Sequence, residues 1–228
     1  MALVKGTVSA NVGVGTVGTT ATLSHNSNTG TDRLLVVFVG YASSLNCTSV
    51  TYNGVSMTKQ GGWIMNDTGA GFEYDIWYLV APDTGTNNVV ATMSGAGTIG
   101  MMATTFTGAE QTTPLQSLNS AAAATPHTQS ITISDQSMIM GIASSRYSLD
   151  STAPITIDGT AVAFASADLS GAIFLAQVAV WTRNANLSSG SKDVITDTIA
   201  DSFFADNTRI EIKEAAAAPA TRRRIIVC

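Results

Sequence analysis

Short segments of strand length, each followed by a turn signal, recur from one end of this chain to the other. Residues 34–39 form a continuous apolar run, which is typical of a central strand that is buried on both faces. In residues 4–14 and 208–213, apolar residues alternate with polar ones, as in strands with one buried face. Helical periodicity is nearly absent, so the pattern predicts an all-β sandwich or barrel of about a dozen strands.

Two dipeptides favour tight hairpin turns. Asn53 and Gly54 separate residues 48–52 from residues 55–58, and both turn residues tolerate the positive φ that a type I′ turn requires. Asp158-Gly159 follows a second apolar run in the same way. We therefore expect one hairpin at each place.

The same order of features occurs twice along the chain, at nearly the same spacing. The two series are Leu34 to Val37, Asn53-Gly54 and Ile76-Trp77, and then Met138 to Gly141, Asp158-Gly159 and Val180-Trp181. We hypothesise a degenerate duplication, with halves at residues 30–110 and 134–213 inside one β-sandwich domain that spans residues 1–213. Chance likeness between unrelated strands is the alternative.

The polar part of the composition is mostly uncharged. Charged residues make up only 12% of the chain, whereas about 25% is typical of soluble domains. The net charge is −5, and three of the 11 basic residues are adjacent, at residues 222–224. The rest of the chain is therefore acidic. Since phosphate contact needs a basic face, we expect no nucleic-acid partner.

Nothing in the sequence predicts export or membrane insertion. Residues 1–6 lack the apolar h-region of a signal peptide, and no apolar run approaches the roughly 18 residues of a membrane span. Cys47 and Cys228 are too few for a disulfide framework. We therefore expect synthesis and folding in a reducing cytoplasm, with no membrane partner.

No constellation of residues predicts catalysis. Asp-Thr-Gly occurs at residues 67–69 and 83–85, as in aspartic proteases, but neither triplet follows the apolar strand that such a site needs. His25 and His127 lie in polar segments without neighbours at metal-ligand spacing, so we expect both in surface loops. The sequence therefore predicts no enzyme, no cofactor and no metal site, and a structural calcium ion at the acids near turns is the alternative.

Aromatic residues outside the core would favour carbohydrate binding, because a ring offers a large apolar face for stacking. Trp77 and Trp181 lie in apolar strands, where we expect them in the core. Trp63 follows the first hairpin and two glycines, and with Tyr41 it forms the candidate glycan-binding pair. Packing of both rings in the core or at its rim is the alternative.

The end of the chain has an unusual composition. Residues 214–221 are mostly alanine and predict a linker. A basic and then apolar segment follows, and we assign it as an assembly arm that pairs with a neighbouring subunit and adds a strand to its sheet. The residues of this arm are Arg222, Arg223, Arg224, Ile225, Ile226 and Val227.

Four phrases of the sequence are similar to β-sandwich domains of phage virion proteins and bacterial surface proteins. They are residues 32–39, 50–58, 76–82 and 104–115. The resemblance spans roughly residues 30–213 and rests on strand and turn phrases, so it transfers no functional residue. It implies a jelly-roll-like antiparallel sandwich with a structural or adhesive role.

These observations together predict a structural virion protein of a tailed phage. We expect a capsid decoration (cement) or head-fibre subunit first and a tail component next, assembled in the host cytoplasm. Its expected partners are other capsid or tail proteins and further copies of itself. A carbohydrate-binding or adhesion module is the alternative.

Overall fold

The computed structural model describes residues 2–11, 18–42, 44–64, 72–122, 127–133, 137–145, 155–157, 160–162, 164–168, 177–182, 189–196 and 206–216. Every regular element in these residues is a β-strand, from β1 to β18. The strands pair antiparallel in four sheets, which confirms the predicted all-β fold. No helix of the described residues is long and apolar enough to cross a membrane.

The first nine strands build two sheets, which we call repeat 1. Their bounds are β1 Val4–Asn11, β2 Gly18–Ser27, β3 Leu34–Ala42, β4 Cys47–Tyr52, β5 Val55–Ser56, β6 Thr58–Ile64, β7 Phe72–Val80, β8 Gly85–Gly97 and β9 Ile99–Thr107. Five strands form the inner sheet, in the order β1-β9-β3-β7-β6, and four form the outer sheet, in the order β2-β8-β4-β5. The first strand thus pairs with the last, and the second with the last but one.

The other nine strands form repeat 2. Their bounds are β10 Leu115–Ala122, β11 His127–Ile133, β12 Met138–Ser145, β13 Ile155–Ile157, β14 Thr160–Val162, β15 Phe164–Asp168, β16 Gln177–Thr182, β17 Gly190–Thr196 and β18 Asp206–Ile212. The inner sheet has the order β10-β18-β12-β16-β15, and the outer sheet has the order β11-β17-β13-β14.

The two repeats have the same topology. When nine is added to each strand number, the strand order of each sheet in repeat 1 becomes the strand order of the corresponding sheet in repeat 2. The registers also correspond, since Val37 pairs with Trp77 in repeat 1 and Gly141 pairs with Trp181 in repeat 2. Matching strand orders are what a duplication requires. The repeats begin at β1 and β10, so each extends further toward the N-terminus than the predicted halves.

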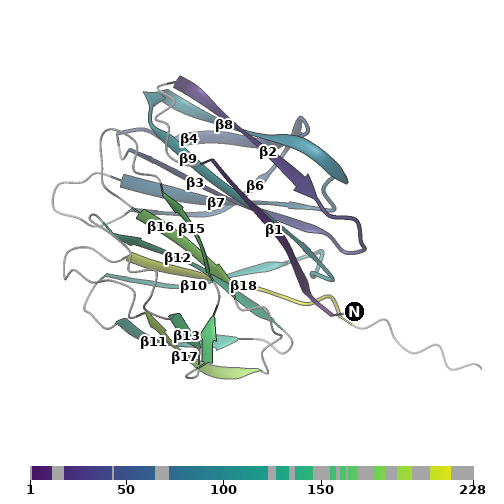
Figure 1. Cartoon of the computed structure of the whole chain (residues 1–228), viewed down its shortest axis with the longest axis vertical. Coiled ribbons are helices and arrows are strands. Elements are labelled where there is room, and N and C mark those ends of the chain that lie inside the picture. The colour runs from purple at the N-terminus through teal and green to yellow at the C-terminus, as the bar shows by residue number, and fades with distance from the viewer. Residues whose placement is uncertain are drawn as a thin grey trace, which may run out of the picture.

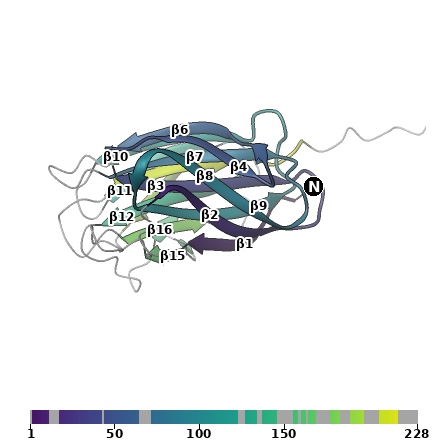
Figure 2. The same cartoon turned by 90° about the horizontal axis from the view of Figure 1, so that it is seen from above.

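The four sheets lie in layers, with the two inner sheets in the middle of the stack (Figure 1), and their strands run largely along one common direction (Figure 2). One buried cluster, which includes Val37 and Tyr52, lies between the sheets of repeat 1. A second cluster, which includes Phe106 and Ile210, lies between the two inner sheets. The repeats therefore share a hydrophobic core and form one folded unit.

Strand β3 shows why the inner sheet of repeat 1 needs cover on both faces. All of its residues from 34 to 39 are at most 4% exposed, as the apolar run predicts. Successive side chains of a strand point to opposite faces. Leu34 and Val36 accordingly belong to the cluster between the repeats, and Leu35 and Val37 to the cluster inside repeat 1.

The first predicted hairpin is confirmed. β4 pairs with β5, and Tyr52 lies opposite Val55 across a two-residue turn. Asn53 has a φ of 49° and Gly54 a φ of 78°, the positive values that a type I′ turn requires. β13 and β14 form the corresponding pair in repeat 2, whereas the Asp158-Gly159 turn lies outside the described residues.

Replacing Gly54 with alanine is expected to lower the free energy of unfolding by about 1–2 kcal/mol. No atom lies within 4 Å of a Cβ built on Gly54, so the cost comes from the left-handed backbone and not from a clash. Gly54→Asn is the matched control, because asparagine tolerates this conformation and should retain most of the stability. Urea unfolding of the two variants gives the measurement, and equal stabilities would contradict the expectation.

Three details of the predicted strands are wrong. Val4 is 54% exposed, because the pairing of β1 with β9 shifts between Lys5 and Val8 and changes which side chains face inward. The alanine run at residues 121–124, followed by Pro126, favours a loop, but residues 121–122 belong to β10. β18 was expected to have one polar face, but Glu211 is fully buried because this inner strand is covered on both sides.

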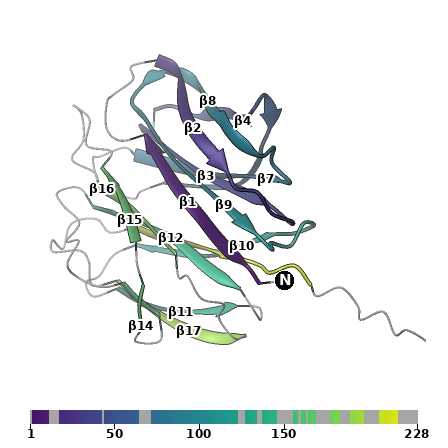
Figure 3. The same cartoon turned by 45° about the vertical axis from the view of Figure 1, so that its right-hand side comes forward.

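Residues 213–215 form backbone hydrogen bonds with residues 108–114, the segment between the two repeats, at one end of the stack. Lys213 N donates to Pro114 O at 2.9 Å, Glu110 N donates to Lys213 O at 2.9 Å, and Ala215 N donates to Gly108 O at 2.8 Å. Residues 214–215 therefore pair with the body. The sequence had predicted a linker that begins at residue 214, so the prediction is wrong for these two residues. Figure 3 shows this end of the described chain close to the N-terminus.

Candidate functional site

Tyr41, one residue of the predicted glycan-binding pair, is buried and not exposed to a ligand. Its side chain is 2% exposed and belongs to the core of repeat 1, so its ring offers no face to a sugar. Trp63 lies in β6, but its side chain is outside the described part of the structure, as are the arm residues 222–227. Trp77 is 7% exposed, as expected of a core residue.

His25, expected in a surface loop, is instead a buried residue of β2. The strand alternates strictly, so that Leu23, His25 and Ser27 point inward while Thr22 and Ser24 point outward. His25 is 1% exposed. This alternation is present in the sequence and is the signal that identifies the strand.

Two hydroxyl groups hold the His25 ring between the sheets of repeat 1. Nδ1 lies 3.0 Å from Ser9 Oγ on β1, and Nε2 lies 2.8 Å from Thr105 Oγ1 on β9. Tyr52 packs edge-on against the ring, with centroids 6.4 Å apart. Burial lowers the pKa of His25 to about 4, so the ring is neutral at pH 7. Both ring nitrogens contact hydroxyl groups, so the ring connects three strands, β1, β2 and β9.

A second polar cluster lies at the β6 edge of repeat 1. Asp75 on β7 is 1% exposed, and its Oδ2 lies 2.8 Å from the Lys59 Nζ on β6. Lys59 Nζ also lies 5.8 Å from the ring centroid of Trp77. Tyr41 on β3 donates a hydrogen bond to the Asp75 carboxylate, and Cys47 on β4 lies within its electrostatic influence. The cluster thus joins four strands.

The electrostatics of this cluster favour protonated neighbours around Asp75. Burial, the charge of Asp75 and the hydrogen bond to it raise the pKa of Tyr41 well above its usual value. Burial, followed by the charge of Asp75, raises the pKa of the Cys47 thiol to about 12. Cys47 is therefore a protonated thiol at neutral pH, which makes it a poor nucleophile and a poor metal ligand.

Repeat 2 carries a buried acid of its own. Glu211 on β18 is fully buried and accepts a hydrogen bond of 2.5 Å from Ser137 Oγ. In the register of the repeats, Glu211 occupies the position that Thr105 occupies in repeat 1, where Thr105 contacts His25. The two repeats thus place different polar groups at the same point of the same scaffold.

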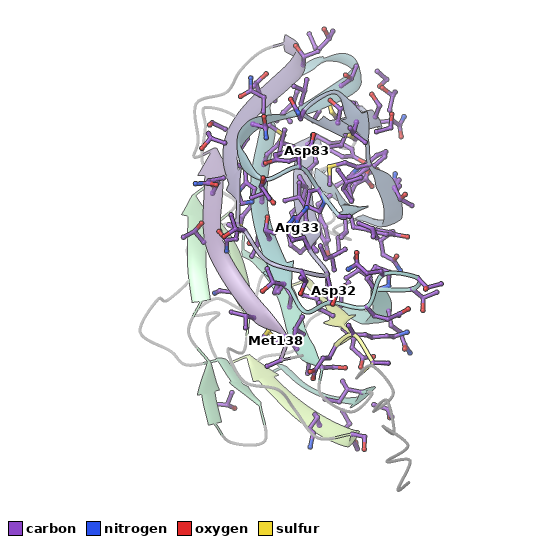
Figure 4. The ribbon with its side chains drawn as sticks, turned by 90° about the vertical axis from the view of Figure 1, so that its right-hand side faces the viewer. Asp32, Arg33, Asp83 and Met138 are labelled. Atoms are coloured by element: carbon purple, nitrogen blue, oxygen red, sulfur yellow. The ribbon has the colours of Figure 1, made fainter. Side chains whose placement is uncertain are left out.

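Arg33 holds together the loops at one end of repeat 1. Its Nε donates to Pro82 O at 3.0 Å and its Nη1 donates to Gly30 O at 2.6 Å. Figure 4 shows Arg33 between Asp83 and Asp32 on this side of the molecule, with Met138 of repeat 2 beyond them. These contacts to backbone carbonyls indicate a structural clamp.

The described Asp-Thr-Gly triplet is part of a turn. Asp83 Oδ2 accepts a hydrogen bond of 2.9 Å from Asn53 Nδ2, and Gly85 has a φ of 88°. Asp83 therefore ties the loop before β8 to the first hairpin. This is the ordinary use of these residue types in turns and not a protease site.

The outer sheet of repeat 1 presents a face of uncharged polar side chains. Asn26 pairs with Thr86 in repeat 1, and Thr132 pairs with Ser191 at the corresponding place in repeat 2. All four side chains are exposed. The four strands of the outer sheet of repeat 1 contain no Asp, Glu, Lys or Arg. Such a face suits close approach to another uncharged surface better than recognition of a charged ligand.

Within the described residues, no group of three or more His, Cys, Asp or Glu side chains is placed to hold a metal ion. The buried polar groups contact neighbouring strands of the same scaffold. No family model matches this chain, and neither the curated proteins nor the solved structures contain a match to it.

Proposed function

We propose that this chain is a structural protein of a tailed-phage particle, most specifically a capsid decoration or head-fibre subunit. The observation that carries the proposal is the stack of two topologically identical sandwiches around a shared core. Buried clusters on both faces of the inner sheet of repeat 1 make a stiff body, because packed interiors deform little. The uncharged outer face of repeat 1 supports docking against another protein.

We also assign each repeat as a jelly roll. The nested pairing of β1 with β9, β2 with β8 and β3 with β7 supports this assignment. Jelly rolls occur in viral capsid and lectin domains, so the assignment agrees with a particle protein. Fold alone does not fix function, and the particle experiments below carry the test.

The partners in this proposal are capsid or tail proteins, and the arm at residues 222–227 grips them. Its three arginines are opposite in sign to the acidic body, and its apolar residues have the β-branched character of an added strand. Ala216, which precedes this segment in the sequence and is the last described residue, is exposed.

Removing residues 217–228 is expected to abolish self-association or attachment while leaving the fold intact. The cut falls after Ala215, whose backbone bond to Gly108 is retained, so the free energy of unfolding should change by less than about 0.5 kcal/mol. Light scattering gives the oligomeric mass of the full and shortened chains. A full-length variant with Arg222, Arg223 and Arg224 replaced by glutamine separates the effect of charge from that of length.

The direct test of the proposal is the composition of purified particles. Phage particles from the organism that encodes this chain are banded on a density gradient, and their proteins are identified by mass spectrometry. We expect peptides of this chain in the particle band in many copies. Their presence only in the soluble fraction would contradict a virion role, and a glycan array would then test the adhesion alternative.

A further inference from the structure

We propose that Lys59 and Asp75 join covalently, through an intramolecular amide bond between Lys59 Nζ and Asp75 Cγ. The two residues lie on adjacent strands, β6 and β7, and the amine is already 2.8 Å from a carboxylate oxygen. In the β6–β7 register Lys59 lies opposite Trp77, and a bulge follows between Lys59 and Gly61. Lys59 therefore reaches Asp75 diagonally across the strand pair.

The surroundings of Asp75 favour a neutral amide over an ion pair. Asp75 is 1% exposed, inside a cluster of apolar side chains of repeat 1. A carboxylate in such a place loses its hydration, and attraction to one lysine offsets this loss only in part. An amide carries no net charge and needs only hydrogen-bonding partners, so burial favours the condensed product.

The reaction is a condensation that needs no oxidant or external group. A proton passes from the Lys59 ammonium to the Asp75 carboxylate, which gives an amine and a carboxylic acid. The amine lone pair attacks Asp75 Cγ, the C–N bond forms, one C–O bond breaks, and one water molecule leaves. The side chain of Lys59 is 42% exposed, so a path to solvent for the water lies along it.

Tyr41 is placed to assist this step. Its hydroxyl donates a hydrogen bond to the Asp75 carboxylate, so it can stabilise the negative oxygen of the tetrahedral intermediate. The raised pKa of Tyr41 keeps its proton in place at neutral pH. Loss of a single donor of this kind slows acyl chemistry by about 100-fold or more.

The bond would fasten an edge strand to the sheet. β6 is the last strand of its inner sheet and pairs only with β7 among the described strands. Edge strands have one free side and open more easily than central strands. A covalent link from β6 to β7 removes that route of opening, which suits a protein that must remain folded outside a cell.

Intact-mass spectrometry of the purified full chain tests the bond. We expect a mass 18 Da below the sequence mass, the loss of one water. Trypsin should then fail to cut after Lys59, because the modified lysine is not recognised. Residues 34–146, which contain no other lysine or arginine before Arg146, should appear as one peptide that is also 18 Da light.

Four variants complete the experiment. Lys59→Arg and Asp75→Ala should have their full calculated masses, Lys5→Arg should keep the 18 Da loss, and Tyr41→Phe should lose water about 100-fold more slowly. The wild-type measurement decides the proposal even where a variant fails to fold. A full sequence mass, or normal cleavage after Lys59 whatever the intact mass, would overturn it.

Discussion

Truncating Phe106 to alanine is expected to lower the free energy of unfolding by about 3–5 kcal/mol. Phe106 is fully buried in the cluster that joins the two inner sheets. Its removal costs the transfer free energy of the ring and leaves a cavity between two sheets that cannot easily close around it. Urea unfolding followed by tryptophan fluorescence and by circular dichroism gives the measurement.

The repeat topology provides a matched variant on the other side of the same core. Ile212 ends β18, as Phe106 lies near the end of β9, and it is fully buried in the same cluster. Ile212→Ala should cost about 2–5 kcal/mol. Val55→Ala, at a side chain that is 48% exposed, should change stability by less than about 0.5 kcal/mol.

The shape of the transition separates one folded unit from two. A shared core predicts a single cooperative transition that both variants shift as a whole. Two transitions, with each variant shifting only one of them, would show that the repeats unfold independently and would contradict the shared core.

The sequence was sufficient for the strands whose signal is local. The apolar run at residues 34–39 and the Asn53-Gly54 turn each have one physical solution, and the structure has both. The repeated order of features likewise pointed to the matching topologies. The layer order was not accessible, because it depends on which face of each sheet meets another sheet.

The buried polar residues were the main feature that the sequence did not predict, because their burial also depends on which face of a sheet meets another sheet. His25 looked like a loop residue because its neighbours Ser24 and Asn26 are polar, yet in a strand those neighbours face the other way. The alternation in residues 208–213 predicted that Glu211 is exposed on a half-buried strand, but a second layer covers that face and Glu211 is buried. The Lys59–Asp75 contact joins two different strands, and no local pattern in the sequence indicates that these two residues meet.

Stability is expected to fall by about 2 kcal/mol between pH 7 and pH 5, mainly through His25. The pKa of His25 is lowered by burial from 6.5 to about 4 in the folded protein. Above pH 6.5 the ring is neutral in both states, and pH has no effect through it. Between pH 6.5 and 4 the unfolded state binds a proton that the folded state excludes, so stability falls as the pH falls.

The full effect, reached near pH 4, is about 3 kcal/mol, because each pKa unit corresponds to about 1.4 kcal/mol. Most carboxylates titrate below pH 5, so the interval from pH 7 to pH 5 reports mainly on histidine. The chain has only two histidines, which allows an assignment by substitution. His25→Gln should keep a polar contact to one hydroxyl and remove most of the pH dependence.

His127→Gln is the control and should leave the pH dependence unchanged. The measurement is the free energy of unfolding in urea at pH 7 and pH 5 for the three proteins. Persistence of the full dependence in His25→Gln would mean that an acid, and not the buried imidazole, carries it. Its loss in both variants would mean that His127 is buried and neutral as well, and that each repeat contains its own acid-sensitive position.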